Sequence, residues 1–247
     1  VVRSRGADVS SLRKIAVGTD TVHAAVMRRA VETFGPVVSC GYGMAEVLPP
    51  LSLLGPEEYM TGAQIEERLL HSVGKPYPHI DLKIMDELGT EVPEGRTGYI
   101  HVQSPSRASG YIGAEQKDDR RFLDGGWFAS EDIGYLDTAK NLFVLGRESH
   151  RITTPEGDIF ARKIEDVCLQ REDVISACAV AEKGELLVAV ECGCEASDDL
   201  EASLLPLIRI IVKNMPVRIL AVDRIPETEA GKVDRASVRR LFHSEMR

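Results

Sequence analysis

The sequence predicts an α+β protein of 247 residues, in which a β-rich part precedes a small α+β domain. Two observations lead to this fold class. Between residues 73 and 145, short apolar stretches alternate with turn residues such as Gly89 and Gly95, a texture typical of short strands. After Gly146 and Arg147 the pattern changes to paired strands and helices. We therefore expect two domains, residues 1–145 and residues 146–247.

The first part begins with a helix and a strand. Apolar residues recur at helical spacing from Val22 to Phe34, so a helix is expected over residues 21–34, and Gly35-Pro36 ends it. Residues 37–40 then read as a short buried strand. Further strands are expected at 81–85, 98–103 and 141–145. These strands form either a small barrel or a sheet.

The second part combines strands and helices in one small domain. Lys183-Gly184 separates two runs rich in valine, leucine and alanine, which indicates two adjacent strands joined by a turn. The expected elements are a helix over residues 162–170, strands over 174–181 and 185–191, a helix over 198–213, a strand over 217–222 and a helix over 236–245.

Composition excludes several classes of function. The net charge of −9 argues against a nucleic-acid partner, because neutralising phosphates requires a basic face. No apolar run is long enough to span a bilayer, and the N-terminus lacks the apolar stretch of a signal peptide. Five cysteines, an odd number, include no second pair at zinc-type spacing near Cys192 and Cys194. We expect structural thiols and a cytoplasmic setting.

Five short segments carry the functional signal through their order along the chain. Each is common by itself, since exposed lysines and acidic turns occur in most proteins. From the N-terminus they read GYGMAE at 41–46, TGYI at 97–100, WFASED at 127–132, GR at 146–147 and ETEAGKVDR at 227–235.

Taken in this order, the segments resemble the adenylate-forming ligases, the superfamily of acyl-CoA synthetases, fatty acyl-AMP ligases and peptide-synthetase adenylation domains. The resemblance runs from about residue 10 to residue 240 and covers only the C-terminal half of such an enzyme. It implies that residues 1–145 are the C-terminal part of the large adenylation domain, and that residues 146–247 are its small mobile C-terminal domain. The phosphate loop of the family has no counterpart here, so we expect the chain to be an incomplete part of the enzyme.

The resemblance assigns a nucleotide site to three of the segments. Tyr42, followed by Gly43, matches the aromatic residue that stacks on adenine, a geometry-tolerant contact. Asp132 matches the carboxylate that accepts both ribose hydroxyls, and Arg147 matches the arginine that reaches ribose and phosphate. Glu131 stands where the family has glycine, and a bulky anion at that position is expected to crowd the nucleotide.

Other positions match the family's metal ligand, its hinge, its acyl pocket and its catalytic lysine. Glu46 matches the carboxylate that holds Mg²⁺, a cation that prefers oxygen ligands. Ser149 occupies the hinge between the domains, and Gly18 sits where the family has a glycine turn beside the acyl chain. Lys232 matches the mobile lysine whose ammonium bridges the attacking carboxylate and the α-phosphate as charge develops.

The function implied is ATP-dependent formation of acyl-AMP from a carboxylic acid, fatty or aromatic, followed by transfer of the acyl group to a thiol. The thiol belongs to coenzyme A or to an acyl carrier protein. Ala45, in place of the usual threonine, and the unusual segment 152–165, in place of a glycine-rich hairpin, favour the carrier protein. The alternative is a non-catalytic relative that binds nucleotide or acyl-AMP, or that docks a carrier protein.

Overall fold

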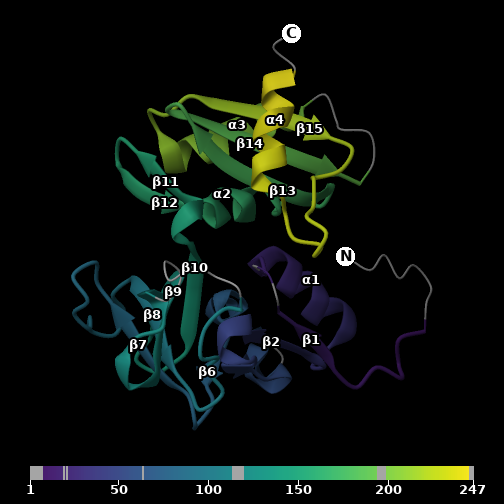
Figure 1. Cartoon of the computed structure of the whole chain (residues 1–247). Coiled ribbons are helices and arrows are strands. Elements are labelled where there is room, and N and C mark those ends of the chain that lie inside the picture. The colour runs from purple at the N-terminus through teal and green to yellow at the C-terminus, as the bar shows by residue number, and fades with distance from the viewer. Residues whose placement is uncertain are drawn as a thin grey trace. The chain divides into compact units, whose positions relative to one another are not determined.

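A computed structural model describes residues 8–18, 20, 22–62, 64–112, 120–193 and 199–244 (Figure 1). The chain forms two compact units that meet at Glu148 and Ser149, three residues beyond the expected boundary. Both units combine helices with sheets, which confirms the α+β class. No helix in the described part of the chain is long and apolar enough to cross a bilayer.

The first unit opens with a four-stranded sheet covered by one helix. Strands β1 (Ile15–Val17) and β2 (Val38–Tyr42) are parallel, and β3 (Ser52–Leu54) and β6 (Lys75–Pro76) continue the sheet in antiparallel pairing. Helix α1 (Ala24–Phe34) buries Met27 and Val31 against this sheet. Short elements complete the region: η1 (Ala45–Val47), η2 (Pro56–Tyr59), β4 (Met60–Thr61), β5 (Gln64–Ile65) and η3 (Glu67–His71).

Helix α1 ends where the sequence predicts and begins later. Gly35 adopts a φ of 72°, which terminates the helix after Phe34. At the other end, His23 is extended with ψ of 140°, so the first helical residue is Ala24. Of the earlier residues expected to be helical, Thr21 lies outside the described residues.

The second sheet of this unit contains four antiparallel strands in the order β10-β9-β8-β7, rather than a closed barrel (Figure 1). The predicted strands correspond to β7 (Asp81–Met85), β8 (Gly98–Gln103) and β10 (Leu142–Arg147). Strand β9 (Trp127–Leu136), preceded by η5 (Asp124–Gly126), was not predicted. It forms the centre of the sheet and contains the WFASED segment.

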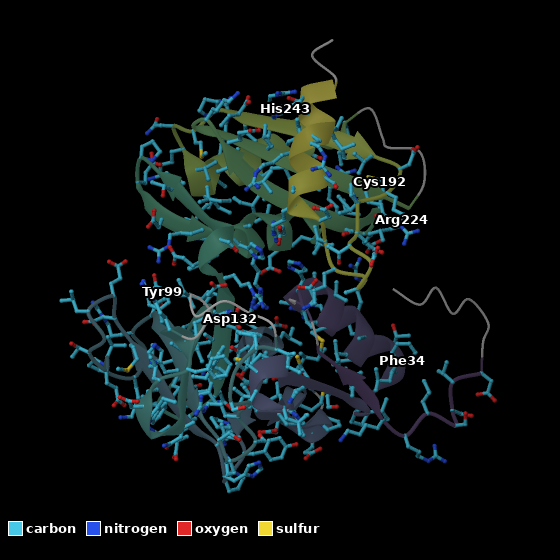
Figure 2. All side chains as sticks on the ribbon, viewed as in Figure 1. Phe34, Tyr99, Asp132, Cys192, Arg224 and His243 are labelled. Carbon is cyan, nitrogen blue, oxygen red and sulfur yellow. The ribbon has the colours of Figure 1, made fainter. Side chains whose placement is uncertain are left out.

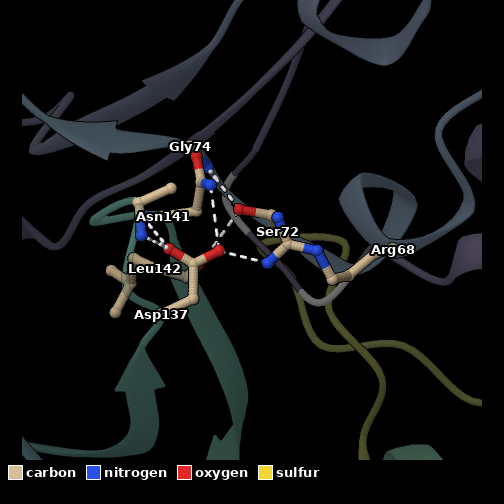
Figure 3. Close-up of polar contacts among 7 residues, drawn as sticks. Arg68, Ser72, Gly74, Asp137, Asn141 and Leu142 are labelled. Atoms are coloured by element: carbon tan, nitrogen blue, oxygen red, sulfur yellow. Dashed lines mark hydrogen bonds and ion pairs between the residues drawn. The ribbon is translucent and has the colours of Figure 1, made fainter. Parts of the chain in front are cut away.

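A buried polar cluster joins the two sheets at the start of β10 (Figure 3). Asp137 accepts hydrogen bonds from Arg68 and from both the backbone and the side chain of Asn141, the last at 3.0 Å. The Ser72 hydroxyl donates to the Leu142 carbonyl at 2.9 Å, and Leu142 N donates to the Gly74 carbonyl at 2.8 Å. The segment after η3 is therefore fixed to the turn between β9 and β10.

The Asp137 carboxylate is expected to make the first unit sensitive to acid. Partial burial alone would raise its pKa, but the hydrogen bonds from Asn141 and Arg68 prevail and hold the pKa below its ordinary value. A depressed folded-state pKa contributes stability above the unfolded value of about 3.9, and this contribution is lost as the pH falls through the folded value. The stability difference between wild type and Asp137→Asn, measured by thermal unfolding, should therefore be full above about pH 5 and shrink below about pH 4. A difference independent of pH would contradict this assignment.

The second unit contains a hairpin, a three-stranded sheet and three helices. After η6 (Glu148–His150), strands β11 (Arg151–Thr154) and β12 (Gly157–Phe160) pair in antiparallel fashion, so a hairpin forms despite its departure from the family pattern. Helix α2 (Ala161–Cys168) follows directly. The remaining elements are β13 (Val174–Glu182), β14 (Glu185–Cys192), α3 (Leu200–Val212), β15 (Val217–Val222) and α4 (Arg235–Ser244).

The sheet of the second unit has the order β13-β14-β15, with β14 parallel to β15 and antiparallel to β13. Alternate residues of β13 and β14 form a buried apolar face with Val238 and Phe242 of α4. All three strands and all three helices predicted here are present, with bounds that differ by at most two residues. The closing helix thus packs on the sheet through its apolar side.

Candidate nucleotide and catalytic site

An irregularity in β9 determines where Asp132 points. On β8, Tyr99 pairs with Ile133 and His101 with Ala129, so the three residues from Ser130 to Asp132 oppose the single residue Ile100. On the other side, the register to β10 also shifts between Val144 and Gly146. Bulges bend a strand and redirect its side chains, and they are over-represented next to active sites. Here two of them flank the same carboxylate.

The Ser130 hydroxyl holds the bulge together. It donates a hydrogen bond to the Ile100 carbonyl at 2.7 Å and accepts one from the backbone N–H of Asp132 at 3.2 Å. Ser130 is buried, whereas the next residue, Glu131, is exposed. Glu131 is therefore exposed next to Asp132, and its effect on a bound nucleotide stays a prediction.

Three of the predicted nucleotide-binding residues converge on one point. The Tyr42 hydroxyl donates to Asp132 Oδ2 at 2.6 Å, and Arg147 Nε lies 3.3 Å from Asp132 Oδ1. Arg147 is the direct cross-strand partner of Asp132 in the β9–β10 register. The Asp132 side chain is 14% exposed and that of Arg147 54% exposed, so the arginine remains accessible to a ligand. Asp132 lies close to Tyr99 of β8 (Figure 2).

Tyr42 enters this cluster as a neutral hydrogen-bond donor. Burial raises the pKa of its phenol well above the usual range, and the negative charge of Asp132 raises it further. The ring packs against the apolar core formed around Val47, Leu51 and Phe128. A partly buried, neutral phenol therefore fixes one oxygen of the carboxylate from the end of β2.

The two predicted glycines occupy positions where a side chain would not fit well. A Cβ added to Gly43 would lie 2.2 Å from Pro49 Cβ, so the chain after Tyr42 passes directly against the proline. A Cβ added to Gly18 would lie 3.1 Å from the Gly41 carbonyl oxygen, beside the strand that carries Tyr42. Both glycines permit close backbone approach, which is one of the common reasons for glycine near a ligand.

Glu46 belongs to a cluster that the sequence did not reveal. Its Oε1 accepts a hydrogen bond from the Tyr111 hydroxyl at 2.5 Å, and Arg121 donates to the same hydroxyl at 2.7 Å. The Arg121 guanidinium also lies over the rings of Tyr111 and Phe128, with distances of 5.2 and 5.7 Å to the centroids. No motif marks Tyr111 or Arg121, because they meet Glu46 only through folding.

The donor set around Glu46 suits magnesium only in company with a phosphate ligand. In the described part of the chain, no group of three or more His, Cys, Asp or Glu side chains is arranged so that it could hold a metal ion. Magnesium, however, is commonly held by one or two carboxylates together with substrate phosphates and water. A single oriented carboxylate is compatible with that arrangement and not with a self-contained metal site.

Lys232 and Ser149 lie in the second unit. Lys232 is exposed in a turn closed by the bridge between Glu227 and Val233, and Gly231 before it has a φ of 73°. Ser149 is exposed in η6, at the first residue of the second unit. The structure thus brings together Tyr42, Asp132 and Arg147 in the first unit, with Glu46 on the short helix η1 that follows β2.

Comparison with known proteins shows which enzymes this chain is similar to. A family model described as AMP-binding enzyme matches residues 2–112. Medium/long-chain-fatty-acid–CoA ligase FadD8 of Mycobacterium tuberculosis is 28% identical over 95% of this chain and 42% of its own length. Fatty acid–[acyl-carrier-protein] ligase ScoC of Streptomyces coeruleorubidus is 25% identical over 95% of this chain and 46% of its own.

The structural comparison leads to the same group of enzymes. Amide bond synthetase McbA from Marinactinospora thermotolerans superposes with a TM-score of 0.82 and 30% identity, over 95% of this chain and 48% of that one. The chain therefore spans about half the length of the relatives it matches. From the ordered motifs, the convergent tyrosine, aspartate and arginine, and these similarities, we conclude that the chain belongs to the adenylate-forming superfamily, the group of acyl-CoA ligases and adenylation enzymes.

Proposed function

We propose that this chain supplies the ribose-binding site and the catalytic lysine of an ATP-dependent ligase that activates a carboxylic acid. In the first step, a carboxylate oxygen attacks the α-phosphorus of ATP, the bond to the β-phosphate oxygen breaks, and pyrophosphate leaves. In the second step, a thiol sulfur attacks the acyl carbon and AMP leaves. The single observation that carries the proposal is the contact of Tyr42 and Arg147 with the two oxygens of Asp132.

Each residue of the cluster has a defined role in this scheme. A carboxylate offers about four acceptor positions, so Asp132 retains capacity for both ribose hydroxyls beside its contacts with Tyr42 and Arg147. Hydrogen bonds to a charged acceptor are worth about 1.5–3 kcal/mol each. Tyr42 supplies the ring for adenine, and the half-exposed Arg147 supplies positive charge toward the ribose and phosphate.

Magnesium and the substrates complete the proposal. Glu46 would hold a magnesium ion together with phosphate and water, and the ion would neutralise charge on the phosphates. Gly18, beside Gly41, marks the side on which the acyl group would lie. FadD8 is named for a fatty-acid–CoA ligase activity and ScoC for ligation to an acyl carrier protein. We propose a fatty or aromatic acid as substrate, and coenzyme A or a carrier protein as the thiol acceptor.

The competing proposal is a non-catalytic relative that binds nucleotide or acyl-AMP. One feature of the sequence that favours it is Glu131, the anion in place of glycine, and that side chain is exposed on β9. Retention of Tyr42, Asp132, Arg147 and Lys232 together favours catalysis, because binding alone has no use for a lysine that acts on developing charge.

The site is tested by nucleotide affinity. Asp132→Ala should weaken binding of AMP and of a non-hydrolysable acyl-AMP analogue by about 10- to 100-fold, since at least one charge-assisted hydrogen bond of about 1.5–3 kcal/mol is lost. Isothermal titration calorimetry on the 247-residue chain measures the change in Kd.

Glu131→Gln is the matched control, because it neutralises the adjacent, exposed carboxylate and should leave the Kd unchanged. Equal effects of the two substitutions, or none from Asp132→Ala, would overturn the ribose site. ATP–pyrophosphate exchange then separates catalysis from binding: analogue binding without exchange in the longest natural polypeptide that carries these residues would support the non-catalytic relative.

A further inference from the structure

The loop that presents Lys232 is ordered by a short internal hydrogen-bond pattern. Thr228 N donates to the Lys232 carbonyl at 2.7 Å, and Lys232 N donates to Thr228 Oγ1 at 3.2 Å. Gly231 N donates back to the Thr228 carbonyl at 2.9 Å, and Asp234 N donates to the Pro226 carbonyl at 2.8 Å. These bonds define a compact turn, but none of them fixes the turn to the rest of the unit.

Two carboxylates attach the ends of this loop to the sheet. At its start, the backbone N–H of Ile225 donates to Glu191 Oε2, on β14, at 2.9 Å. At its end, Arg235 NH1 lies 2.7 Å from Glu165 Oε1, on α2. Arg235 is the first residue of α4 and follows Lys232 by three positions.

The contact between Glu165 and Arg235 is buried and shared with the backbone of β13. The Glu165 side chain is 2% exposed and that of Arg235 17% exposed. Ala179 N donates to the same Glu165 oxygen at 3.0 Å, while Arg235 NH1 donates to the Ala179 carbonyl at 2.7 Å. One residue of β13 is therefore held by both members of the ion pair, which joins α2, β13 and α4 at a single point.

A contribution to folding stability does not by itself explain why an ion pair is buried at this position. Removing two charges from water costs several kcal/mol per ion, so an apolar pair of similar volume would often stabilise a core equally well. Unlike apolar packing, a hydrogen-bonded ion pair fixes the relative position and orientation of its two side chains. Asp234 adds a second fixed point, since its Oδ1 accepts from the N–H groups of Ala236 and Ser237, at 3.1 Å each, and caps α4.

We propose that Glu165 and Arg235 are positioning residues for Lys232: their buried ion pair fixes the end of the lysine loop relative to the sheet of the second unit. The inference rests on the proposed function of Lys232. Catalysis by a positioned charge loses about 100-fold for a misplacement on the order of 1 Å, so the anchoring of the loop would appear directly in the rate of adenylation.

A matched control pair exists at the other end of the same helix. His243 Nε2 and Glu182 Oε2 lie 2.6 Å apart and also join α4 to β13, eleven positions after Lys232. Glu182→Gln therefore weakens a more exposed link between the same two elements without touching the lysine loop. Glu165→Gln removes the negative charge of the pair, and Arg235→Lys keeps the positive charge while losing the guanidinium nitrogen that contacts both Glu165 and Ala179.

The first readout needs no activity. Trypsin cleaves after lysine, and Lys232 is exposed, so the rate of cleavage between Lys232 and Val233 in the native 247-residue chain reports the order of the loop. We expect Glu165→Gln to raise this rate about 10-fold, Arg235→Lys to raise it less, and Glu182→Gln to leave it unchanged. Unchanged cleavage in both Glu165→Gln and Arg235→Lys would overturn the inference. If Glu165→Gln does not fold, the cleavage rate of Arg235→Lys alone tests the inference.

The second readout is kinetic. In the longest natural polypeptide that carries these residues, Glu165→Gln should lower kcat of adenylation by between about 10- and 100-fold with little change in the KM for ATP. A purely structural role would instead lower activity only in proportion to the fraction unfolded, measured by thermal unfolding of the same variant, and this outcome would overturn the inference. If Lys232→Ala leaves adenylation normal, the proposed function fails, while the cleavage result still reports the anchoring of the loop.

Discussion

Replacement of Lys232 by alanine is expected to lower the rate of acyl-adenylate formation by about 100- to 1,000-fold. The lysine is exposed, and the hydrogen bonds that order its turn use its backbone N–H and carbonyl rather than its ammonium group. The substitution should therefore lower the rate of catalysis and leave the stability of the fold unchanged. Loss of one group that stabilises developing charge in a transition state typically costs on the order of 100- to 1,000-fold in kcat.

The measurement is ATP–pyrophosphate exchange with a panel of fatty and aromatic acids, first with the 247-residue chain and then with the longest natural polypeptide that carries it. Lys183→Ala is the matched control, because Lys183 is also exposed and also adjoins a turn glycine of the second unit. Transfer of the acyl group from preformed acyl-AMP to a thiol should be spared by Lys232→Ala. Normal exchange by Lys232→Ala would remove the lysine from the mechanism.

The sequence predicted the elements whose pattern is local. The strands of the three-stranded sheet in the second unit are largely apolar runs bounded by turn residues, and the helices of this unit carry apolar residues at a regular spacing, so each could be recognised from its own residues. The hairpin of β11 and β12 has no such apolar run and was not predicted as a pair of strands. Strand β9 escaped prediction because Ser130, Glu131 and Asp132 interrupt its apolar pattern. These polar residues sit in a bulge, and a bulge is defined by the register with neighbouring strands rather than by the strand itself.

The same distinction applies to the site. Tyr42, Asp132 and Arg147 could be named because their motifs are recognisable, but their mutual contact spans 90 residues between Tyr42 and Asp132. Tyr111 lies 65 residues from Glu46, and the partner of Arg235 lies 70 residues upstream of it. No local pattern indicates which arginine or tyrosine will meet a given carboxylate. These contacts follow from the arrangement of strands and helices, which the sequence defined only in outline.

Strand β9 is held in place by contacts of two aspartates. Asp132 and Asp137 lie on and just after β9, and both are held by arginines, Arg147 and Arg68. Asp137 fixes the turn after β9 to Arg68 of η3, and the segment that contains Ser72 and Gly74 is bonded to Leu142 at the start of β10 (Figure 3). The same segment makes a backbone crossing in which Gly74 approaches Leu53, and Leu53 pairs with Gly41, the residue before Tyr42.

That crossing gives the largest stability effect that we expect in the chain. Gly74 has a φ of 80°, and a Cβ added there would lie 1.9 Å from both the carbonyl carbon and the oxygen of Leu53. Neither backbone atom is able to move without breaking the pairing of β3 with β6. Gly74→Ala should destabilise the first unit by more than about 3 kcal/mol, because the positive φ alone costs roughly 1–2 kcal/mol and the collision adds to it.

Gly89→Ala separates the two contributions. Gly89 has a nearly equal φ of 76°, but no atom lies within 4 Å of an added Cβ, so only the conformational cost of about 1–2 kcal/mol applies. The chain contains a single tryptophan, Trp127, at the start of β9, and its fluorescence during urea denaturation therefore reports unfolding of the first unit. Equal destabilisation by the two substitutions would show that the backbones of residues 53 and 74 do not approach as described. A much larger loss for Gly74→Ala is the expected result, because only there does the collision with the Leu53 backbone add to the conformational cost.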